Sequence, residues 1–196
     1  MIGRPPQYEV PPDGYPVAYE RWLRLRDRRR VWVRPILPSD APDLAEAIRC
    51  ADPDTLRRRF LGSTPRLTPT LLRWLTTVDY VRRFALVAFD PGTGRGVAVA
   101  RFEPLDDGVA EVAVVVDPAW RRAGLATALV EMLGRAALER GVHSFGASYL
   151  AENRPISAML DHSAGGVTQL ISHGVTEAAV DLEKRRAGRR EREPQP

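Results

Sequence analysis

The residues whose types and spacing could do chemistry lie where the apolar run "VAEVAVVV", residues 109–116, leads into "DPAWRRAGLATALVEML". Glu111 is the only charged residue of that run, and strand alternation puts its side chain on one face with Ala113 and Val115. A carboxylate that is partly buried among apolar neighbours becomes a better base, and a protonated amine needs a base before it can act as a nucleophile. A solvent-exposed glutamate near a strand end is the alternative interpretation, and the run by itself leaves both open.

The turn that follows, "RRAGLA", leads from this strand into a helix, and Ala123, Gly124 and Ala126 within it have small side chains or none. The first N–H groups of a helix have no partner within it, and Gly124 with its small neighbours would let an anion approach them closely. The helix dipole and the cations of Arg121 and Arg122 favour negative charge there. The pattern predicts a phosphate site. The alternative is that Gly124 only permits a tight turn and that the two arginines are solvated.

Two further elements must hold this corner in place. After Gly124, apolar residues recur at spacings of three and four, which predicts a helix with one buried face that ends at Gly141. The segment "VHSFGASYL" is typical of a strand, and a strand-helix-strand connection places it parallel to "VAEVAVVVD".

The rest of the chain supplies a hairpin, short helices and a meander. "YERWLRLRD" and "RRVWVRPI" suit a hairpin whose second strand stops at Pro35. Ser39, Asp52-Pro53 and Thr68-Pro69 mark the starts of three short helices. The segments "RFALVAFD", "GVAVARFEP" and "VAEVAVVVD" are predicted as adjacent antiparallel strands. A last helix, "RPISAMLDH", opens after Asn153, and "VTQLISHG" and "VTEAAVDLE" follow as strands.

This order of elements predicts a single α/β (α+β) domain over residues 19–183. Residues 1–18, with five prolines, are expected to form a flexible arm. Residues 184–196 carry six basic and two acidic groups, which is the whole formal charge of +4 and is typical of a basic disordered tail. Nucleic-acid binding is not expected, because no aromatic platform or reader motif accompanies this tail.

The composition excludes several classes of protein. No run of about eighteen apolar residues and no signal-peptide core occurs, so we expect a cytoplasmic protein that does not bind a membrane. Cys50 is the only cysteine and is expected to pack in the core rather than to serve as a reactive thiol. The histidines, His143, His162 and His173, lack the close spacing of a metal site, so no metal is expected. The sequence leaves the oligomeric state open.

Arg121-x-x-Gly124-x-Ala126 matches the Gln/Arg-x-x-Gly-x-Gly/Ala pattern of the GNAT superfamily of N-acetyltransferases. The order of elements from Tyr19 to Glu183 also resembles that family. The likeness is greatest to the catalytic domain of bacterial protein lysine acetyltransferases, some of which carry a cyclic-AMP-binding domain. The segments that carry it are "VWVRPILPSD", "LRRRFLG", "VDYVRRFALVAFD", "VARFEP", "VAEVAVVVDPAWRRAGLATALVEML" and "FGASYLAENRPISAMLDHSAG".

The resemblance implies a mixed, splayed sheet flanked by helices, with acetyl-CoA between two diverging strands. It implies that the main chain of Val114, Val115 and Val116 pairs with the pantetheine arm. It implies that the loop after this strand holds the pyrophosphate through Arg121 and the amides of Arg122, Ala123, Gly124, Leu125, Ala126 and Thr127. Asn153 stands where family members contact the cofactor, although an N-cap role would explain it equally well.

The resemblance also implies that Glu111, ten residues before Arg121, is the general base. Glu103 is expected to be exposed at its strand end, and Asp106 and Asp107 are explained as turn residues. Leu160 occupies the position where many GNAT enzymes have a tyrosine acid, and His162 and Ser163 follow it in the last helix.

Arg122 replaces a frequent glycine of the family, and an arginine disfavours positive φ. The short arm cannot supply a cyclic-AMP domain, so regulation of that type is not expected. The predicted function is acetyl transfer from acetyl-CoA to lysine side chains of cytoplasmic proteins. Two alternatives remain: a small-molecule amine acetyltransferase, and a catalytically degenerate acyl-CoA-binding or interaction module.

Overall fold

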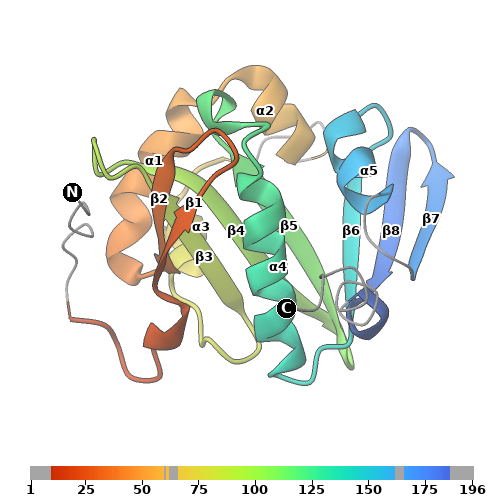
Figure 1. Ribbon diagram of the computed structural model, residues 1–196, viewed down its shortest axis with the longest axis horizontal. Helices are drawn as coiled ribbons and strands as arrows, with labels where there is room; N and C mark the ends of the chain where they lie inside the picture. The colour runs from red at the N-terminus through yellow and green to blue at the C-terminus, as the bar shows by residue number, and fades with distance from the viewer. Residues whose placement is uncertain (1–9, 60, 62–65, 162–165, 186–196) are drawn as a thin grey trace.

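The computed structural model describes residues 10–59, 61, 66–161 and 166–185. Their centre is an eight-stranded mixed sheet with the strand order β1-β2-β3-β4-β5-β6-β8-β7 (Figure 1). The strands are β1 (Arg21–Arg24), β2 (Arg30–Pro35), β3 (Phe84–Phe89), β4 (Gly96–Asp106), β5 (Val109–Val116), β6 (Ser144–Leu150), β7 (Val167–Ser172) and β8 (Val175–Asp181). The hairpin, the meander and the last two strands were all predicted correctly.

Helices cover both faces of the sheet. The α-helices are α1 (Ala41–Cys50), α2 (Pro53–Arg59), α3 (Pro69–Thr76), α4 (Leu125–Leu138) and α5 (Arg154–Asp161), and the short 3-10 helices are η1 (Val17–Tyr19), η2 (Pro38–Asp40) and η3 (Pro118–Trp120). In Figure 1, α4 crosses one face of the sheet over β4 and β5, and α1 and α3 lie behind the opposite face.

The core lies between α4 and the sheet, as the helical periodicity predicted. Leu125, Leu129 and Leu133 of α4 are almost fully buried, together with Phe84 and Phe102 of the sheet. Each fully buried leucine or phenylalanine contributes about 2 kcal/mol through removal of its apolar surface from water. This packing fixes the start of α4 relative to the end of β5.

Helix ends follow the sequence signals in part. The Thr68 hydroxyl accepts a hydrogen bond from the Leu71 N–H at 3.1 Å, so the predicted start of α3 is confirmed. Ser39, in contrast, does not cap α1, because residues 38–40 form η2 and Asp40 precedes the helix. The Asp40 carboxylate instead pairs with the buried Arg34 guanidinium at 2.6 Å.

Cys50 is exposed, contrary to the expectation of core packing. It is the last residue of α1 and stands two positions after the half-buried Ile48, and residues two apart on a helix face different directions. Gly141 ends α4 as predicted: it has φ +78°, its N–H donates to the Leu138 carbonyl at 3.3 Å, and the Val142 N–H donates to the Ala137 carbonyl at 2.9 Å, the pattern of a glycine-terminated helix.

Packing of the chain begins before Tyr19. Tyr15 is buried, meets the Tyr80 ring edge-on at 5.6 Å and donates a hydrogen bond to Glu20 at 2.9 Å. Residues 10–18 therefore do not all belong to a flexible arm, because an aromatic ring within them gains burial against the domain. Residues 1–9 and 186–196, the remainder of the predicted arm and most of the tail, lie outside the described residues.

Candidate active site

The two central strands β5 and β6 run parallel over three register pairs only and then part. The pairs are Val109 with Ser144, Ala110 with Phe145, and Glu111 with Gly146. Beyond them β5 keeps its pairing with β4 as far as Val116, and β6 keeps its pairing with β8 as far as Leu150. The predicted splay is therefore confirmed, and we call the opening between the two strands the fork.

The fork leaves one edge of β5 available. Residues 112–116 have β4 on one side and, among the residues that the structure describes, no strand on the other. Main-chain groups on such an edge can accept a partner in the manner of an added strand. Val114, Val115 and Val116, predicted to bind the pantetheine arm, lie on this edge.

Residues 121–127, which we call the phosphate loop, comprise the link from η3 to α4 and the first three residues of α4. The first helical hydrogen bond runs from the Ala128 N–H to the Gly124 carbonyl at 3.0 Å. Within the described part of the chain, the N–H groups of residues 122–127 donate to no acceptor. The first turn of α4 also holds no acidic residue. The loop thus offers a row of donors at the positive end of a helix dipole, which suits an anion.

Two residues of the phosphate loop have left-handed backbone. Gly124 precedes α4 with φ +87°, which glycine adopts without steric cost. Arg122 has φ +60°, the conformation that its side chain disfavours. The strain costs roughly 1 kcal/mol, and the loop keeps this geometry although the frequent glycine of the family is absent.

The Arg121 side chain points toward α2 instead of along the loop. Its Nε donates to the Val116 carbonyl at 3.1 Å, and its Nη2 donates to the Thr55 hydroxyl at 2.5 Å. Asp52 lies 4.0 Å from the same guanidinium. The hydrogen bond from Thr55, with Arg121 nearby, holds the pKa of the Asp52 carboxyl below its usual range.

Helix α2 links the two sides of the fork. Arg121, which follows η3 and bonds the carbonyl of the last β5 residue, also bonds Thr55 of α2. On the other side, Arg57 of α2 pairs with Glu152, which follows β6, at 2.5 Å. In Figure 1, α2 lies at the end of the sheet where β5 and β6 diverge. Sequence reasoning missed this link, because it depends on contacts between segments far apart in the chain.

Glu111 lies in the last register pair before the fork opens. It pairs with Gly146 of β6 on one side and with Glu103 of β4 on the other. Its side chain is exposed, so the expected partial burial is not found, and it makes no hydrogen bond or ion pair with any described residue. The carboxylate is therefore open to a partner from outside the chain.

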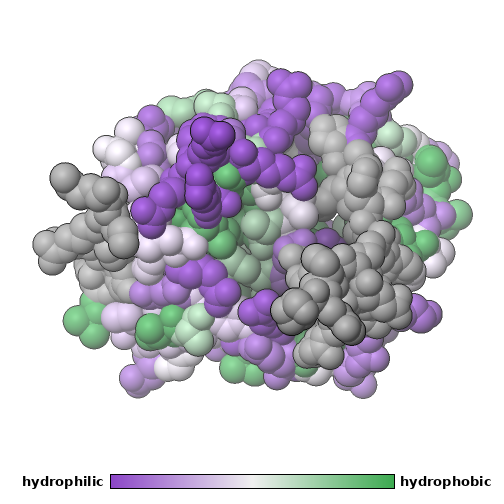
Figure 2. All heavy atoms as spheres, in the orientation of Figure 1, coloured by the Kyte–Doolittle hydropathy of each residue, from purple (hydrophilic) through white to green (hydrophobic). Residues whose placement is uncertain are grey.

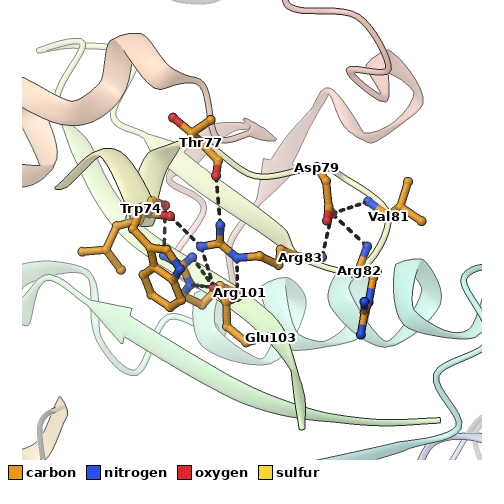
Figure 3. A network of polar contacts seen from close by, with 9 residues as sticks. Trp74, Thr77, Asp79, Val81, Arg82, Arg83, Arg101 and Glu103 are labelled. Atoms are coloured by element: carbon orange, nitrogen blue, oxygen red, sulfur yellow. Dashed lines mark hydrogen bonds and ion pairs between the residues drawn. The ribbon is translucent and has the colours of Figure 1, made fainter. Parts of the chain in front are cut away.

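The carboxylate of Glu103, the neighbour of Glu111 on β4, is hydrogen-bonded to two arginines (Figure 3). It accepts from Arg83 Nε at 2.6 Å and from Arg101 Nε at 2.9 Å. Arg83 also donates to the carbonyls of Thr77 and Trp74 at 3.0 and 2.5 Å. The Glu103 side chain is only 18% exposed, so the expectation of an exposed residue is wrong. Two guanidiniums cover it, and of the two neighbouring carboxylates only Glu111 remains available.

The same network orders the loop before β3. The Asp79 carboxylate accepts from the N–H groups of Val81, Arg82 and Arg83 at 2.8 to 2.9 Å, and Figure 3 shows these three bonds converging on one oxygen. Burial alone would raise the pKa of Asp79, but the three donors hold it below its usual range.

Asn153 is buried and opens α5. Its carbonyl accepts from the N–H groups of Ile156 and Ser157 at 3.0 and 3.3 Å. Leu160, in the position of the frequent tyrosine, is 4% exposed and belongs to the core. His162 and Ser163 lie outside the described residues.

A cavity of about 470 Å³ adjoins the face of β5 that carries Glu111. Ala113 and Val115 line it from β5, Arg101 from β4, and Leu44 and Ile48 from α1. Its walls are mainly apolar with a few polar groups, as in many small-molecule sites. No sequence pattern indicated this cavity, because helices and sheet enclose it only after folding.

Two further classes of feature are absent from the described residues. No three His, Cys, Asp or Glu side chains gather there to hold a metal ion. No helix in that part of the chain could span a membrane.

Residues 30–163 match the family described as the acetyltransferase (GNAT) domain. The chain belongs to the GNAT acetyltransferase family. GNAT acetyltransferases take their acetyl group from acetyl-CoA, which is therefore the co-substrate. The fold and its splayed sheet are those that the resemblance implied.

Known relatives agree with the GNAT assignment. Acetyltransferase Pat of Mycolicibacterium smegmatis is 30% identical over 162 residues, which cover 82% of this chain and 48% of that protein. The chain thus spans about half the length of this curated relative. The crystal structure of the GNAT domain of S. lividans PAT superimposes with a TM-score of 0.76 at 30% identity, covering 85% of this chain and 99% of that one.

A more distant GNAT structure holds the cofactor. The structure of yncA from Salmonella typhimurium with acetyl-CoA has a TM-score of 0.61 at 21% identity, covering 78% of this chain and 94% of that one. At this identity the likeness concerns the fold alone.

Proposed function

We propose that this GNAT domain acetylates lysine side chains of cytoplasmic proteins by direct transfer from acetyl-CoA, with Glu111 as the general base. The observation that carries the proposal is the position of Glu111. Its free carboxylate stands where the fork closes, beside an unpaired strand edge and on the cavity face of β5.

Acetyl-CoA would enter the fork from the end where α4 begins. In this arrangement the amides of residues 122–127 hold the pyrophosphate, and the edge of β5 at Val114, Val115 and Val116 pairs with the pantetheine amides. Asn153, buried next to the start of α5, would contact the cofactor from the opposite side. The unused N–H groups and the unpaired edge both support this assignment.

The reaction then needs two protons removed from the acceptor ammonium, one before the nitrogen attacks and one after it has added. A lysine ammonium has an unperturbed pKa near 10.4, so at neutral pH it must lose a proton before it attacks. Glu111 accepts this proton, directly or through a water molecule, and the free nitrogen adds to the thioester carbon. The nitrogen of the adduct loses its second proton to solvent, the C–S bond breaks, the acetyl group stays on nitrogen, and coenzyme A leaves as a thiolate. Leu160 cannot protonate this thiolate, so the proton comes from water or another group.

The likeness to bacterial protein lysine acetyltransferases favours a protein acceptor over a small amine. Pat of Mycolicibacterium smegmatis and the S. lividans PAT domain each match this chain at 30% identity. The exposure of Glu111 supports the same choice, because a lysine on the surface of a folded protein must reach the base from outside.

The test is incubation of the protein with labelled acetyl-CoA and candidate acceptors, followed by mapping of modified lysines by mass spectrometry. Acyl-CoA synthetases, which the family resemblance suggests, are the first candidates. Label on specific lysines that depends on Glu111 supports the proposal. Label on free amines alone would identify a small-molecule acetyltransferase. Tight acetyl-CoA binding without turnover on any acceptor would identify a binding module.

A further inference from the structure

The hairpin between β1 and β2 is fastened to the phosphate loop, although the two are far apart in sequence. The Arg26 N–H donates to the Ala123 carbonyl at 3.0 Å. Arg29 Nη2 donates to the Ala119 carbonyl at 3.0 Å, and its guanidinium lies 4.1 Å from the centre of the Trp120 ring. These contacts set the hairpin turn against the start of α4.

This attachment puts the Arg26 side chain directly over Gly124. A Cβ atom built on Gly124 would stand 3.3 Å from Arg26 Nε and 3.5 Å from Arg26 Cδ and Cγ. The Nε of the guanidinium is therefore adjacent to the residue that precedes α4, in the middle of the row of unused N–H groups.

Arg26 also has no competing partner within the described residues. Its side chain is exposed and makes no hydrogen bond or ion pair there. Arg121, by contrast, is bonded to Thr55 and to the Val116 carbonyl. Figure 2 shows hydrophilic side chains gathered over the β1–β2 hairpin. Of the two arginines, Arg26 is the one with a guanidinium still available to an anion.

We propose that Arg26 binds the pyrophosphate of acetyl-CoA from the hairpin side, opposite the amides of the phosphate loop. This inference rests on the cofactor arrangement proposed above. A pyrophosphate carries two negative charges, and a guanidinium can bond both oxygens of a phosphate group with parallel N–H donors. The cation that the sequence pattern assigned to Arg121 is then supplied by a residue outside the loop.

The test compares binding of CoA to the wild-type protein and to Arg26→Ala by calorimetry, without an acceptor. The substitution keeps the backbone bond to Ala123 and removes only the side chain. We expect the Kd for CoA to rise about tenfold or more, as for loss of one charged hydrogen bond. Arg26→Lys, which keeps the charge but not the paired donors, should show a smaller rise.

Two comparisons make the result specific. With 3′-dephospho-CoA, which retains the pyrophosphate, Arg26→Ala should cause the same fold-change as with CoA. A loss confined to CoA would move the contact to the 3′-phosphate and overturn the proposal. Arg82→Ala removes an equally exposed cation at the other end of the sheet and should leave the Kd unchanged. An equal rise of the Kd in Arg82→Ala would show that net charge, and not the position of Arg26, causes the effect.

An unchanged Kd in Arg26→Ala would also refute the contact. That outcome would not affect the proposed chemistry, because turnover at saturating acetyl-CoA depends on Glu111 and not on Arg26. Conversely, if Glu111 is not the base, the turnover of Glu111→Gln will equal that of the wild-type protein, whatever the Kd for CoA is.

Discussion

Glu111 and Gly146 are the last residues at which β5 and β6 stand side by side. Gly146 has no side chain to cover the carboxylate, and beyond this pair the strands diverge. A cofactor that fills the fork would therefore end beside Glu111, which would put the proposed base and the thioester at the same point of the sheet.

Glu111→Gln should lower turnover by about 100-fold or more, because the amide cannot accept the proton of the acceptor amine. The Kd for acetyl-CoA should stay nearly unchanged. Steady-state kinetics and calorimetry measure the two quantities. Glu46→Gln, at an exposed position on α1, is the control and should leave both unaltered. Full activity of Glu111→Gln would remove this residue from the mechanism.

Gly124→Glu should abolish CoA binding, since it places a carboxylate against the row of amides. The substitution also strains the backbone at φ +87°. Gly174→Glu is a matched control, because Gly174 has φ +78°, faces open space and lies in the β7–β8 turn. Calorimetry with CoA should find binding lost only in the first variant. Retained affinity there would contradict the assignment of the phosphate loop.

Arg122→Gly should raise the free energy of unfolding by about 0.5 to 1 kcal/mol, because glycine adopts φ +60° without strain. Urea denaturation measures the change. Arg82→Gly is the comparison, since Arg82 does not have positive φ and the substitution there should destabilise. A loss of stability in Arg122→Gly would mean that its side chain makes a compensating contribution.

Glu103→Gln should destabilise the protein by about 2 kcal/mol, because Arg83 and Arg101 would lose the charge between them. Asp54→Asn, in an exposed pair with Arg57, should cost less than about 1 kcal/mol. Urea unfolding of both variants provides the comparison. Equal, small effects would show that the network in Figure 3 contributes little to folding.

The Tyr80 hydroxyl gives a pH-dependent prediction. Burial raises the pKa of Tyr80 from 10.0 to about 12, and the hydroxyl donates to the Ile36 carbonyl at 2.8 Å. Between these two values the unfolded chain releases the proton while the folded chain keeps it, so stability falls as pH rises. Tyr80→Phe should make the fall between pH 10 and pH 12 shallower in denaturation experiments. An identical slope in both proteins would argue against the raised pKa.

Local patterns were sufficient for most of the elements. The apolar, β-branched run "VAEVAVVV" predicted β5, the spacing of three and four after Gly124 predicted α4, and Thr68-Pro69 predicted the start of α3. These signals depend on neighbours within a few residues. Predictions about burial were less successful: Cys50 lies on the exposed side at the end of α1, and Glu103 is covered by Arg83 and Arg101, which the local pattern around it does not reveal.

The sequence by itself determined the strand-loop-helix unit and its glycine, since these follow from backbone conformation and side-chain periodicity. The tertiary structure decided which charges are available: it bonded Arg121 to Thr55, covered Glu103 with two arginines, left Glu111 without a partner among the described residues, and brought Arg26 over Gly124. The reason is physical. A charged side chain binds whichever partner folding brings within about 3 Å, and that partner can come from any part of the chain.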